Sequence, residues 1–225
     1  MANSSSPAFS NPAQTWNTRF AEEGYLFGLD PNEWLRAHAK VWPKNATILS
    51  VADGEGRNSV WLAGLGHRVD AFDIAEVGVA KAQKLAAEKQ VSVNFSVADC
   101  DSFAWPQDAY DGVAAIFVQF AEPSLRDRLF LNIIRCLKPG GVLILQGYTP
   151  KQLEYKTGGP PCVDHLYTKP LLQQRFANME ISNLVEYEAN ITEGTQHRGQ
   201  SALIGMVARK TKPPVGPSTP ATSGT

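Results

Sequence analysis

Short apolar runs alternate with helical patterns along the first two thirds of this chain, and that alternation limits the fold most strongly. Strands are expected at 47–52, 68–74, 91–98, 111–118 and 141–146. Helices are expected between them at 57–65, 76–89 and 124–137. The run at 111–118 is apolar throughout, which is typical of a strand buried on both faces. This β-α-β-α order with short connections predicts a parallel sheet with helices on both faces.

The last third of the chain follows a different pattern. A short helix is expected at 171–176, and two strand-like runs at 181–191 and 201–210 follow with no helix between them. We expect these runs to form an antiparallel hairpin at the sheet edge, turning at Glu193-Gly194. The sequence Lys138-Pro139-Gly140-Gly141 is expected to end the preceding helix in a turn.

Residues 15–210 are expected to fold as one domain between two disordered tails. Residues 1–14 are rich in Ser, Asn, Pro and Ala, and residues 211–225 contain four Pro. Neither stretch can bury enough apolar surface to offset the entropy of ordering. Residues 15–45 are expected to form an N-terminal helical cap, because aromatic-rich, helix-like segments are split there by glycine and proline.

Charge, hydropathy and cysteine content exclude several classes of function. Lys and Arg number 21 against 22 Asp and Glu, giving a net charge of −1, so a broad nucleic-acid footprint is not expected. No apolar run approaches the roughly 20 residues that span a bilayer, and the first residues lack a signal-peptide pattern. Three cysteines without zinc-type spacing indicate a reducing compartment and no bound metal. We therefore expect a cytoplasmic protein that binds neither membrane nor nucleic acid.

A glycine-rich loop, Gly54-Glu55-Gly56, follows the first predicted strand and opens a helix. This position suggests a nucleotide-type ligand at the carboxyl edge of the sheet. Asp73 ends the second strand, where a carboxylate can take both ribose hydroxyls. Asp99 ends the third strand, where a carboxylate can accept a hydrogen bond from an adenine amino group. Three strand ends that converge on one crevice favour a bound nucleoside over unrelated solvated residues.

The chemistry of this loop separates the candidate ligands. The dinucleotide fingerprint G-x-G-x-x-G has one glycine in register here, Gly54, with Ala52 and Arg57 at the other two positions. The carboxylates of Asp53 and Glu55 would repel a pyrophosphate but attract the cationic sulfonium and ammonium of S-adenosylmethionine. One such pair at about 4 Å is worth about 4 kcal/mol at an effective dielectric of about 20. The loop therefore favours S-adenosylmethionine over NAD.

With these features the sequence resembles the class I S-adenosylmethionine-dependent methyltransferases, in particular their tellurite-resistance TehB-like branch. The resemblance runs from about Trp16 to Lys210 and rests on ILSVADGEGRNSVWLA, VDAFDIAEVGVAKAQKLA, VADCDSF, YDGVAAIFV, CLKPGGVLIL and YTPKQLEYKTGGPP. It implies a Rossmann-like, mostly parallel seven-stranded sheet of order 3-2-1-4-5-7-6 with strand 7 antiparallel. It also implies methyl transfer from S-adenosylmethionine, which leaves S-adenosylhomocysteine.

The resemblance implies a cofactor site built from the N-terminal cap, the glycine-rich loop and the strand ends: Trp16, Phe27, Asp53, Gly54, Gly56, Arg57, Asp73, Ile74, Asp99, Cys100 and Phe117. In it the glycines let the backbone approach the methionine part, and Arg57 holds the methionine carboxylate. Trp16 and Phe27 match a lid over the cofactor, hinged at Gly24 and Gly28. Two alternatives stay open: Arg57 as a solvated surface charge, and the two aromatic residues as ordinary packing.

Two departures from the superfamily pattern are visible. Ser50 and Ala52 stand where many members have an acidic residue and a glycine. After the fourth strand, residues 117–120 lack the Asn/Asp-Pro-Pro-aromatic motif of many amine methyltransferases. This argues against methylation of adenine N6 or of a glutamine amide.

The sequence leaves the methyl acceptor and any general base open. A thiolate or chalcogen anion needs no protein base, whereas oxygen and ammonium nucleophiles usually do. The candidate catalytic residues are His165, after the KTGGPP loop, and His197, in EGTQHRGQ. We expect a small-molecule acceptor, with thiol or chalcogen species favoured. An NAD(P)-linked oxidoreductase and a non-catalytic module that binds S-adenosylmethionine or a nucleoside stay open as alternatives, as does the oligomeric state.

Overall fold

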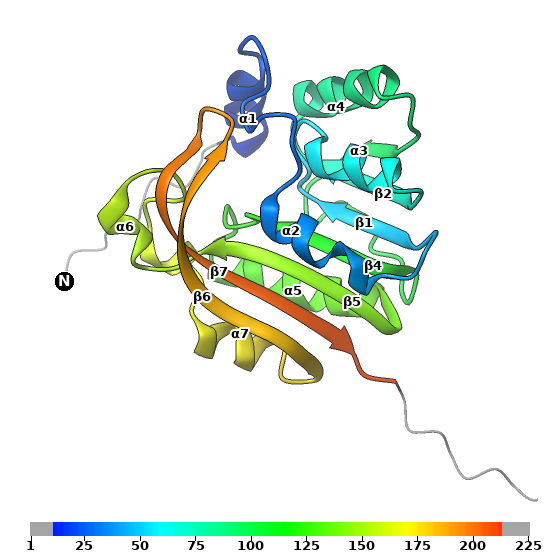
Figure 1. The fold of residues 1–225 in the computed structure, drawn as a ribbon, viewed down its shortest axis with the longest axis vertical. Helices are drawn as coiled ribbons and strands as arrows, with labels where there is room; N and C mark the ends of the chain where they lie inside the picture. The colour runs from blue at the N-terminus through cyan, green and yellow to red at the C-terminus, as the bar shows by residue number, and fades with distance from the viewer. Residues whose placement is uncertain (1–10, 213–225) are drawn as a thin grey trace, which may run out of the picture.

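Seven strands in the order β3-β2-β1-β4-β5-β7-β6 form the sheet of the computed structural model, which describes residues 11–212 (Figure 1). They are β1 (Thr47–Val51), β2 (Arg68–Asp73), β3 (Asn94–Val97), β4 (Tyr110–Ile116), β5 (Leu137–Tyr148), β6 (Met179–Glu193) and β7 (His197–Lys210). Neighbouring strands from β3 to β5 are parallel, and β7 is antiparallel to β5 and β6. The predicted Rossmann-like fold, including its strand order, is confirmed.

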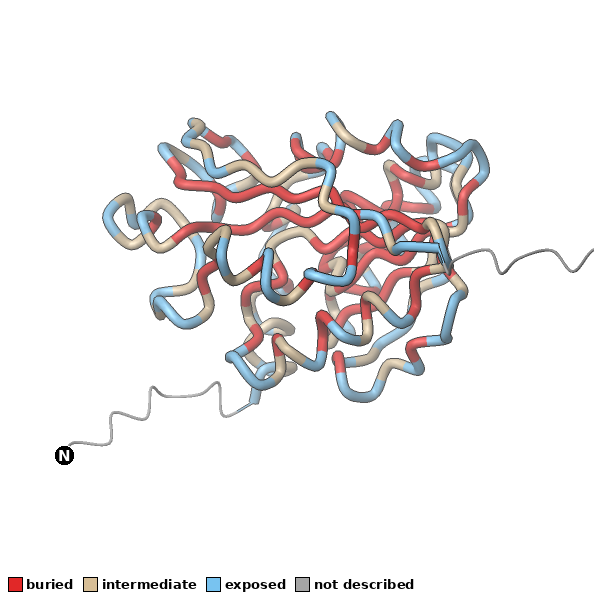
Figure 2. The backbone as a smooth tube through the Cα atoms, turned by 90° about the horizontal axis from the view of Figure 1, so that it is seen from below, coloured by how far each residue is buried: buried red, intermediate tan, exposed pale blue. Residues whose placement is uncertain are grey.

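Helices cover both faces of this sheet because successive side chains of each buried strand point to opposite faces. On β4, Val113 packs into one core with α5 (Pro123–Cys136) and α7 (Lys169–Arg175). Its neighbour Ala114 packs into a second core with α2 (Glu33–His38), η1 (Ala39–Val41) and α3 (Arg57–Gly64). The helix α4 (Glu76–Glu88) packs beside α3. Figure 2 shows that the buried stretches follow the strands through the middle of the molecule.

The first helix, α1 (Pro12–Phe20), begins inside the stretch predicted to be a disordered tail. The side chain of Asn11 accepts a hydrogen bond from the amide of Gln14 at 3.0 Å. Pro12 stands in the first turn, where its missing N–H costs nothing. The tail prediction is therefore wrong for residues 12–14, and residues 1–10 and 213–225 of the two predicted tails lie outside the described residues.

Strand β5 begins directly where α5 ends, so the turn predicted at residues 138–141 is wrong. Tyr110 pairs with Leu137, but Gly112 pairs with Val142, and residues 138–141 bulge out of the ladder between these two pairs. The hairpin of β6 and β7 is present and longer than predicted, since its pairing extends from Met179 with Lys210 to Glu193 with His197.

The remaining elements are short and lie in the connection from β5 to β6: α6 (Gln152–Tyr155) and η2 (Val163–His165). Within residues 11–212, no helix is long and apolar enough to cross a membrane. The same part of the chain holds no group of three or more His, Cys, Asp or Glu side chains arranged to hold a metal ion.

Candidate functional site

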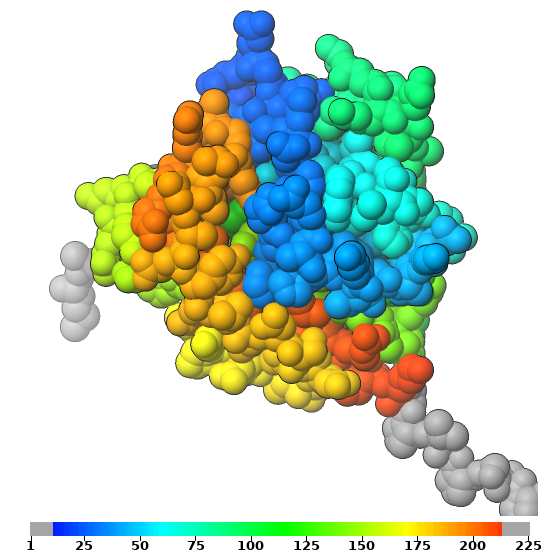
Figure 3. Space-filling model, viewed as in Figure 1, coloured from blue at the N-terminus to red at the C-terminus, as the bar shows by residue number. Residues whose placement is uncertain are grey.

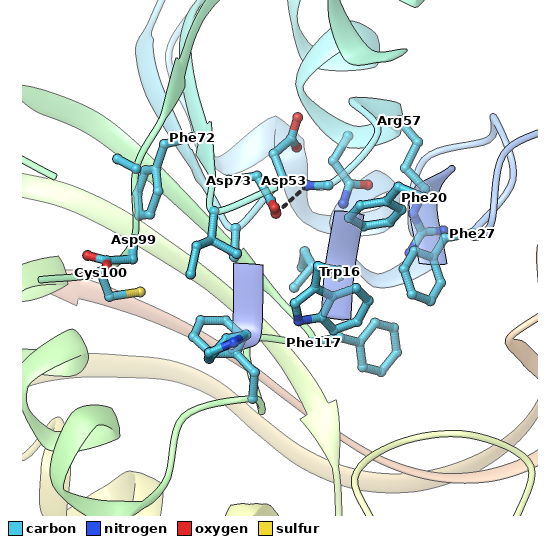
Figure 4. Close-up of a pocket in the computed structure, with 18 of the residues that line it drawn as sticks. Trp16, Phe20, Phe27, Asp53, Arg57, Phe72, Asp73, Asp99, Cys100 and Phe117 are labelled. Carbon is cyan, nitrogen blue, oxygen red and sulfur yellow. Dashed lines mark hydrogen bonds between the residues drawn. The ribbon is translucent and has the colours of Figure 1, made fainter. Parts of the chain in front are cut away.

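A cavity of about 280 Å³ lies at the carboxyl edge of the parallel strands, with α1 on one side (Figure 4). All of the predicted cofactor residues except Gly56 line it: Trp16, Phe27, Asp53, Gly54, Arg57, Asp73, Ile74, Asp99, Cys100 and Phe117. Gly56 instead faces α4, where a Cβ would lie 2.7 Å from the Cβ of Ala82 at a backbone φ of +90°. Glycine at this position therefore lets the loop pack closely against α4.

Two strand ends turn sharply at the floor of the cavity. Ala52, after β1, and Phe117, after β4, have φ values of +49° and +56°, in the left-handed region that disfavours residues with a Cβ. Both residues line the cavity. Ala52 stands where many superfamily members have glycine, and its positive φ shows why glycine is favoured there. The turn nevertheless forms with alanine.

Asp73 ends β2 with its carboxylate buried in the cavity wall. Its Oδ2 accepts from the amide of Gly54 and its Oδ1 from the amide of Ala75, each at 2.8 Å; the first bond is dashed in Figure 4. Burial raises the pKa of this carboxyl from its ordinary value of 3.8 to about 6, although the amides oppose the shift. Each oxygen keeps a further lone pair, so the carboxylate can still accept from a ligand hydroxyl.

Asp99, after β3, is held differently. Its Oδ1 accepts from the amides of Asp101 at 3.0 Å and Ser102 at 2.6 Å, which closes the turn that follows the strand. Hydrogen bonds from Ser102 lower the pKa of this carboxyl, so it is ionised at neutral pH. Cys100 is buried beside it, and burial raises the pKa of its thiol to about 12, so the thiol is not a nucleophile.

The two loop carboxylates do not both face the cavity. Asp53 lines it, but its oxygens accept from the hydroxyl of Ser50 at 2.6 Å and from the hydroxyl and amide of Ser59. Glu55 does not line it, because its Oε2 accepts from the amide of Leu26 at 2.6 Å and its Oε1 pairs with Lys81. The prediction that Glu55 attracts a cationic cofactor is therefore wrong.

Arg57 is buried rather than solvated. Its Nη2 lies 2.6 Å from Oε2 of Glu193, and Asn32 donates to the other oxygen of that carboxylate at 2.8 Å. Burial raises the pKa of Glu193, but contacts with His197 and Arg57 outweigh burial and lower it to about 2. Nη1 of Arg57 is also buried and has no hydrogen-bond partner within the described residues. The Nη1 amino group of this guanidinium is therefore left for an anionic ligand at the cavity wall.

Aromatic side chains enclose one side of the cavity, as Figure 4 shows. Trp16 and Phe20 stack on α1 with ring centres 5.3 Å apart, and Phe27 meets Phe20 edge-on at 6.3 Å. Phe27 also lies 4.6 Å from the ring of His197. We call the residues Trp16, Phe20 and Phe27 the aromatic roof. These residues line the cavity and also pack in one apolar cluster with Leu26 and Ala75.

Only one of the two candidate histidines reaches the cavity. His197 lines it, with its ring 4.5 Å from that of Phe117, and burial lowers the pKa of its imidazole. The structure does not bring His165 there: it is not among the residues that line the cavity, and its Nδ1 lies 3.0 Å from the carbonyl oxygen of Gln119, in the loop after β4.

The cavity also contains residues that the sequence analysis did not single out, among them Phe20, Asn58, Phe120, Asp101 and Leu125. Phe20 could have been found, because it stands four positions after Trp16 and so shares its face of a helix. Asn58 follows Arg57 at the start of α3, whereas Asp101, Phe120 and Leu125 depend on how the segments after β3 and β4 fold back, which no local pattern indicates.

Comparisons with known proteins agree on the kind of domain. Residues 48–141 match a family model described as a methyltransferase domain. A structure reported for the conversion of a disulfide bond into a thioacetal group during echinomycin biosynthesis is similar, with TM-score 0.74, 17% identity, and 89% of this chain and 92% of that chain covered. TehB from Haemophilus influenzae is similar with TM-score 0.64 and 19% identity, over 80% of this chain and 62% of that chain. The N-methyltransferase NodS from Bradyrhizobium japonicum, in complex with S-adenosyl-L-homocysteine, is similar with TM-score 0.66 and 14% identity, over 88% of this chain and 97% of that chain. No significant sequence match to a curated protein is found.

Proposed function

We propose that this chain transfers a methyl group from S-adenosylmethionine to a small molecule, with a thiol or chalcogen acceptor favoured, because residues 48–141 match a methyltransferase domain and the sheet has the strand order 3-2-1-4-5-7-6. The observation that carries the proposal is the single cavity that joins the ends of β1, β2 and β3 to the aromatic roof. The domain match favours methyl transfer over the NAD(P)-linked oxidoreductase considered above.

Each part of the cofactor has a chemically suited partner along the cavity. The carboxylates of Asp73 and Asp99 would accept from the ribose hydroxyls and the adenine amine, and Ile74 would cover a face of the ring. The unpaired Nη1 of Arg57 would take the methionine carboxylate. The sulfonium would then lie near the roof, where Trp16 attracts cations by about 0.5–2 kcal/mol per contact.

The roof also bears on the choice of acceptor. Aromatic and aliphatic side chains around the reacting methyl exclude water, which favours a soft nucleophile that loses hydration easily. Bound there, S-adenosylmethionine would supply its methyl group to the acceptor sulfur, its carbon–sulfonium bond would break, and S-adenosylhomocysteine with a neutral thioether would leave. A thiol proton would pass to His197, whose lowered pKa keeps its imidazole neutral and able to accept it. The thioacetal-forming neighbour shows that this fold serves a reaction at sulfur elsewhere.

A panel of acceptors with methyl-labelled S-adenosylmethionine tests the proposal. Thiols and chalcogen oxyanions should be labelled at higher kcat/KM than amines and carboxylates. Labelling of amines or carboxylates alone would overturn the acceptor class. If S-adenosylhomocysteine binds but no member of the panel is labelled, the chain is a non-catalytic binding module.

We expect binding of S-adenosylhomocysteine to strengthen about tenfold between pH 5 and pH 7, because the ribose hydroxyls need ionised Asp73, whose pKa is about 6. Asp73→Asn should cost about 1.5–3 kcal/mol of affinity at pH 7 and remove the pH dependence. Asp99→Asn should keep the pH dependence of binding, since Asp99 is already ionised at pH 5 and does not titrate between pH 5 and pH 7. Calorimetric titration at several pH values measures the affinity and its pH dependence.

The raised pKa of Asp73 also affects stability. It makes the folded state bind more protons than the unfolded state between pH 4 and 6, so this group lowers the unfolding free energy as pH rises.

A further inference from the structure

A single lysine ties the N-terminal segment to the glycine-rich loop. Lys81 on α4 directs its ammonium at the carbonyl oxygens of Glu22 and Gly24, at 2.8 and 2.7 Å, and at Oε1 of Glu55, at 2.9 Å. These contacts use all three N–H donors of the ammonium. Two of the acceptors belong to the turn after α1, and the third belongs to the loop on which the cofactor would lie.

The other oxygen of Glu55 holds the same segment one step further along. It accepts from the amide of Leu26 at 2.6 Å, and the carbonyl oxygen of Leu26 accepts from the amide of Thr195 at 3.0 Å. Leu26 therefore bridges the glycine-rich loop and the turn between β6 and β7. Figure 3 shows the N-terminal segment in blue, lying between the orange β6–β7 hairpin and the cyan α3 region. Phe27, the next residue, is part of the aromatic roof.

We propose that Glu55 and Lys81 are positioning residues that couple the glycine-rich loop to the aromatic roof, so that the roof closes over a cofactor held by the loop. The inference rests on the proposed function. Glu55 lies between Gly54, which lines the cavity, and Gly56, which packs on α4, so a shift of the loop moves its carboxylate. That carboxylate is 4% exposed, and both of its oxygens are engaged with the N-terminal segment and with Lys81.

The coupling predicts that loss of the ammonium loosens the roof without touching the adenosine end. Lys81→Met keeps the aliphatic stem but leaves two carbonyl oxygens and a buried carboxylate unpaired. S-adenosylhomocysteine should then dissociate about tenfold faster, whereas the affinity for adenosine, which lacks the methionine part under the roof, should change less than twofold. Lys84→Met is the matched control, since that side chain lies on the same helix, is 74% exposed and pairs with Glu88 at 3.9 Å.

Stopped-flow dissociation and hydrogen exchange of residues 20–28 test this. The expected result is faster ligand release and lost ligand-dependent protection of the Leu26 amide in Lys81→Met, a partial return in Lys81→Arg, and wild-type behaviour in Lys84→Met. Glu55→Gln keeps an acceptor for the Leu26 amide but removes the charge. It should show the same faster release and lost protection, and it replaces Lys81→Met as the test if that variant does not fold. Wild-type release and protection in both variants would overturn the coupling. Failure of the wild-type protein to bind S-adenosylhomocysteine would instead overturn the proposed function.

Discussion

Removal of residues 1–21 is expected to lower turnover at least about 100-fold while S-adenosylhomocysteine still binds. The deletion removes α1 and with it Trp16 and Phe20, but keeps the carbonyl oxygens that Lys81 holds. Without these rings the reacting methyl is open to water and the acceptor loses one wall. Misplacement of a reactant by about 1 Å can cost about 100-fold in rate. The deletion leaves Asp73 and Asp99, the proposed partners of the adenosine part, in place, so residual binding should remain.

The matched control removes residues 1–10 only, which leaves the Asn11 cap and all of α1 in place. We expect it to turn over at the wild-type rate. Single-turnover kinetics with labelled cofactor, together with thermal unfolding of both variants, separate a lost roof from a lost fold. If the longer deletion keeps near-wild-type turnover, Trp16 and Phe20 are packing residues and no lid operates.

Arg57→Met is expected to lower the unfolding free energy at pH 7 by about 3–5 kcal/mol, because it leaves a buried carboxylate without its partner. Glu193 lies 2.6 Å from the guanidinium and is 8% exposed. Its lowered pKa places its stabilising contribution above the ordinary pKa of 4.5 and removes that contribution as pH falls toward about 2. The stability difference between Arg57→Met and wild type should therefore shrink on acidification.

The double variant Arg57→Met/Glu193→Gln completes the cycle. It should recover much of the lost stability at pH 7, because no unpaired charge remains. Its affinity for S-adenosylhomocysteine should stay low while its affinity for adenosine is normal, since only the former carries the methionine carboxylate. Urea unfolding and calorimetry measure the two effects. A loss below about 1 kcal/mol in the single variant would contradict this account of the ion pair.

Local sequence patterns predicted the parallel core because its strands are apolar runs and its helices carry one apolar stripe each. The strand order followed only from the family resemblance, since nothing local indicates which strands pair. The fate of Glu55 could not be predicted, because its partners, Lys81 and the Leu26 amide, lie 26 and 29 residues away. Likewise, α1 begins in a polar, proline-containing stretch and is fixed by tertiary contacts, such as the Asn17 side chain that accepts from the Val77 amide at 2.9 Å.

The site shows the same division. Asp73 and Asp99 were predictable, because the carboxyl ends of parallel strands meet at one edge whatever the rest of the fold does. His165 and His197 were not distinguishable by sequence, since each follows a loop of Gly and polar residues. The hairpin register decides between them, because β7 begins at His197 and places that residue opposite Glu193, beside Phe27 and Phe117.

Calorimetric titration of the full chain with S-adenosylhomocysteine, and separately with NADH, tests the central claim most directly. The cavity should bind one S-adenosylhomocysteine per chain, with affinity weakened by about 1.5–3 kcal/mol in Asp73→Asn, and should give no heat of binding with NADH. Binding of NADH, or S-adenosylhomocysteine binding that is unchanged in Asp73→Asn, would contradict the assignment of this cavity.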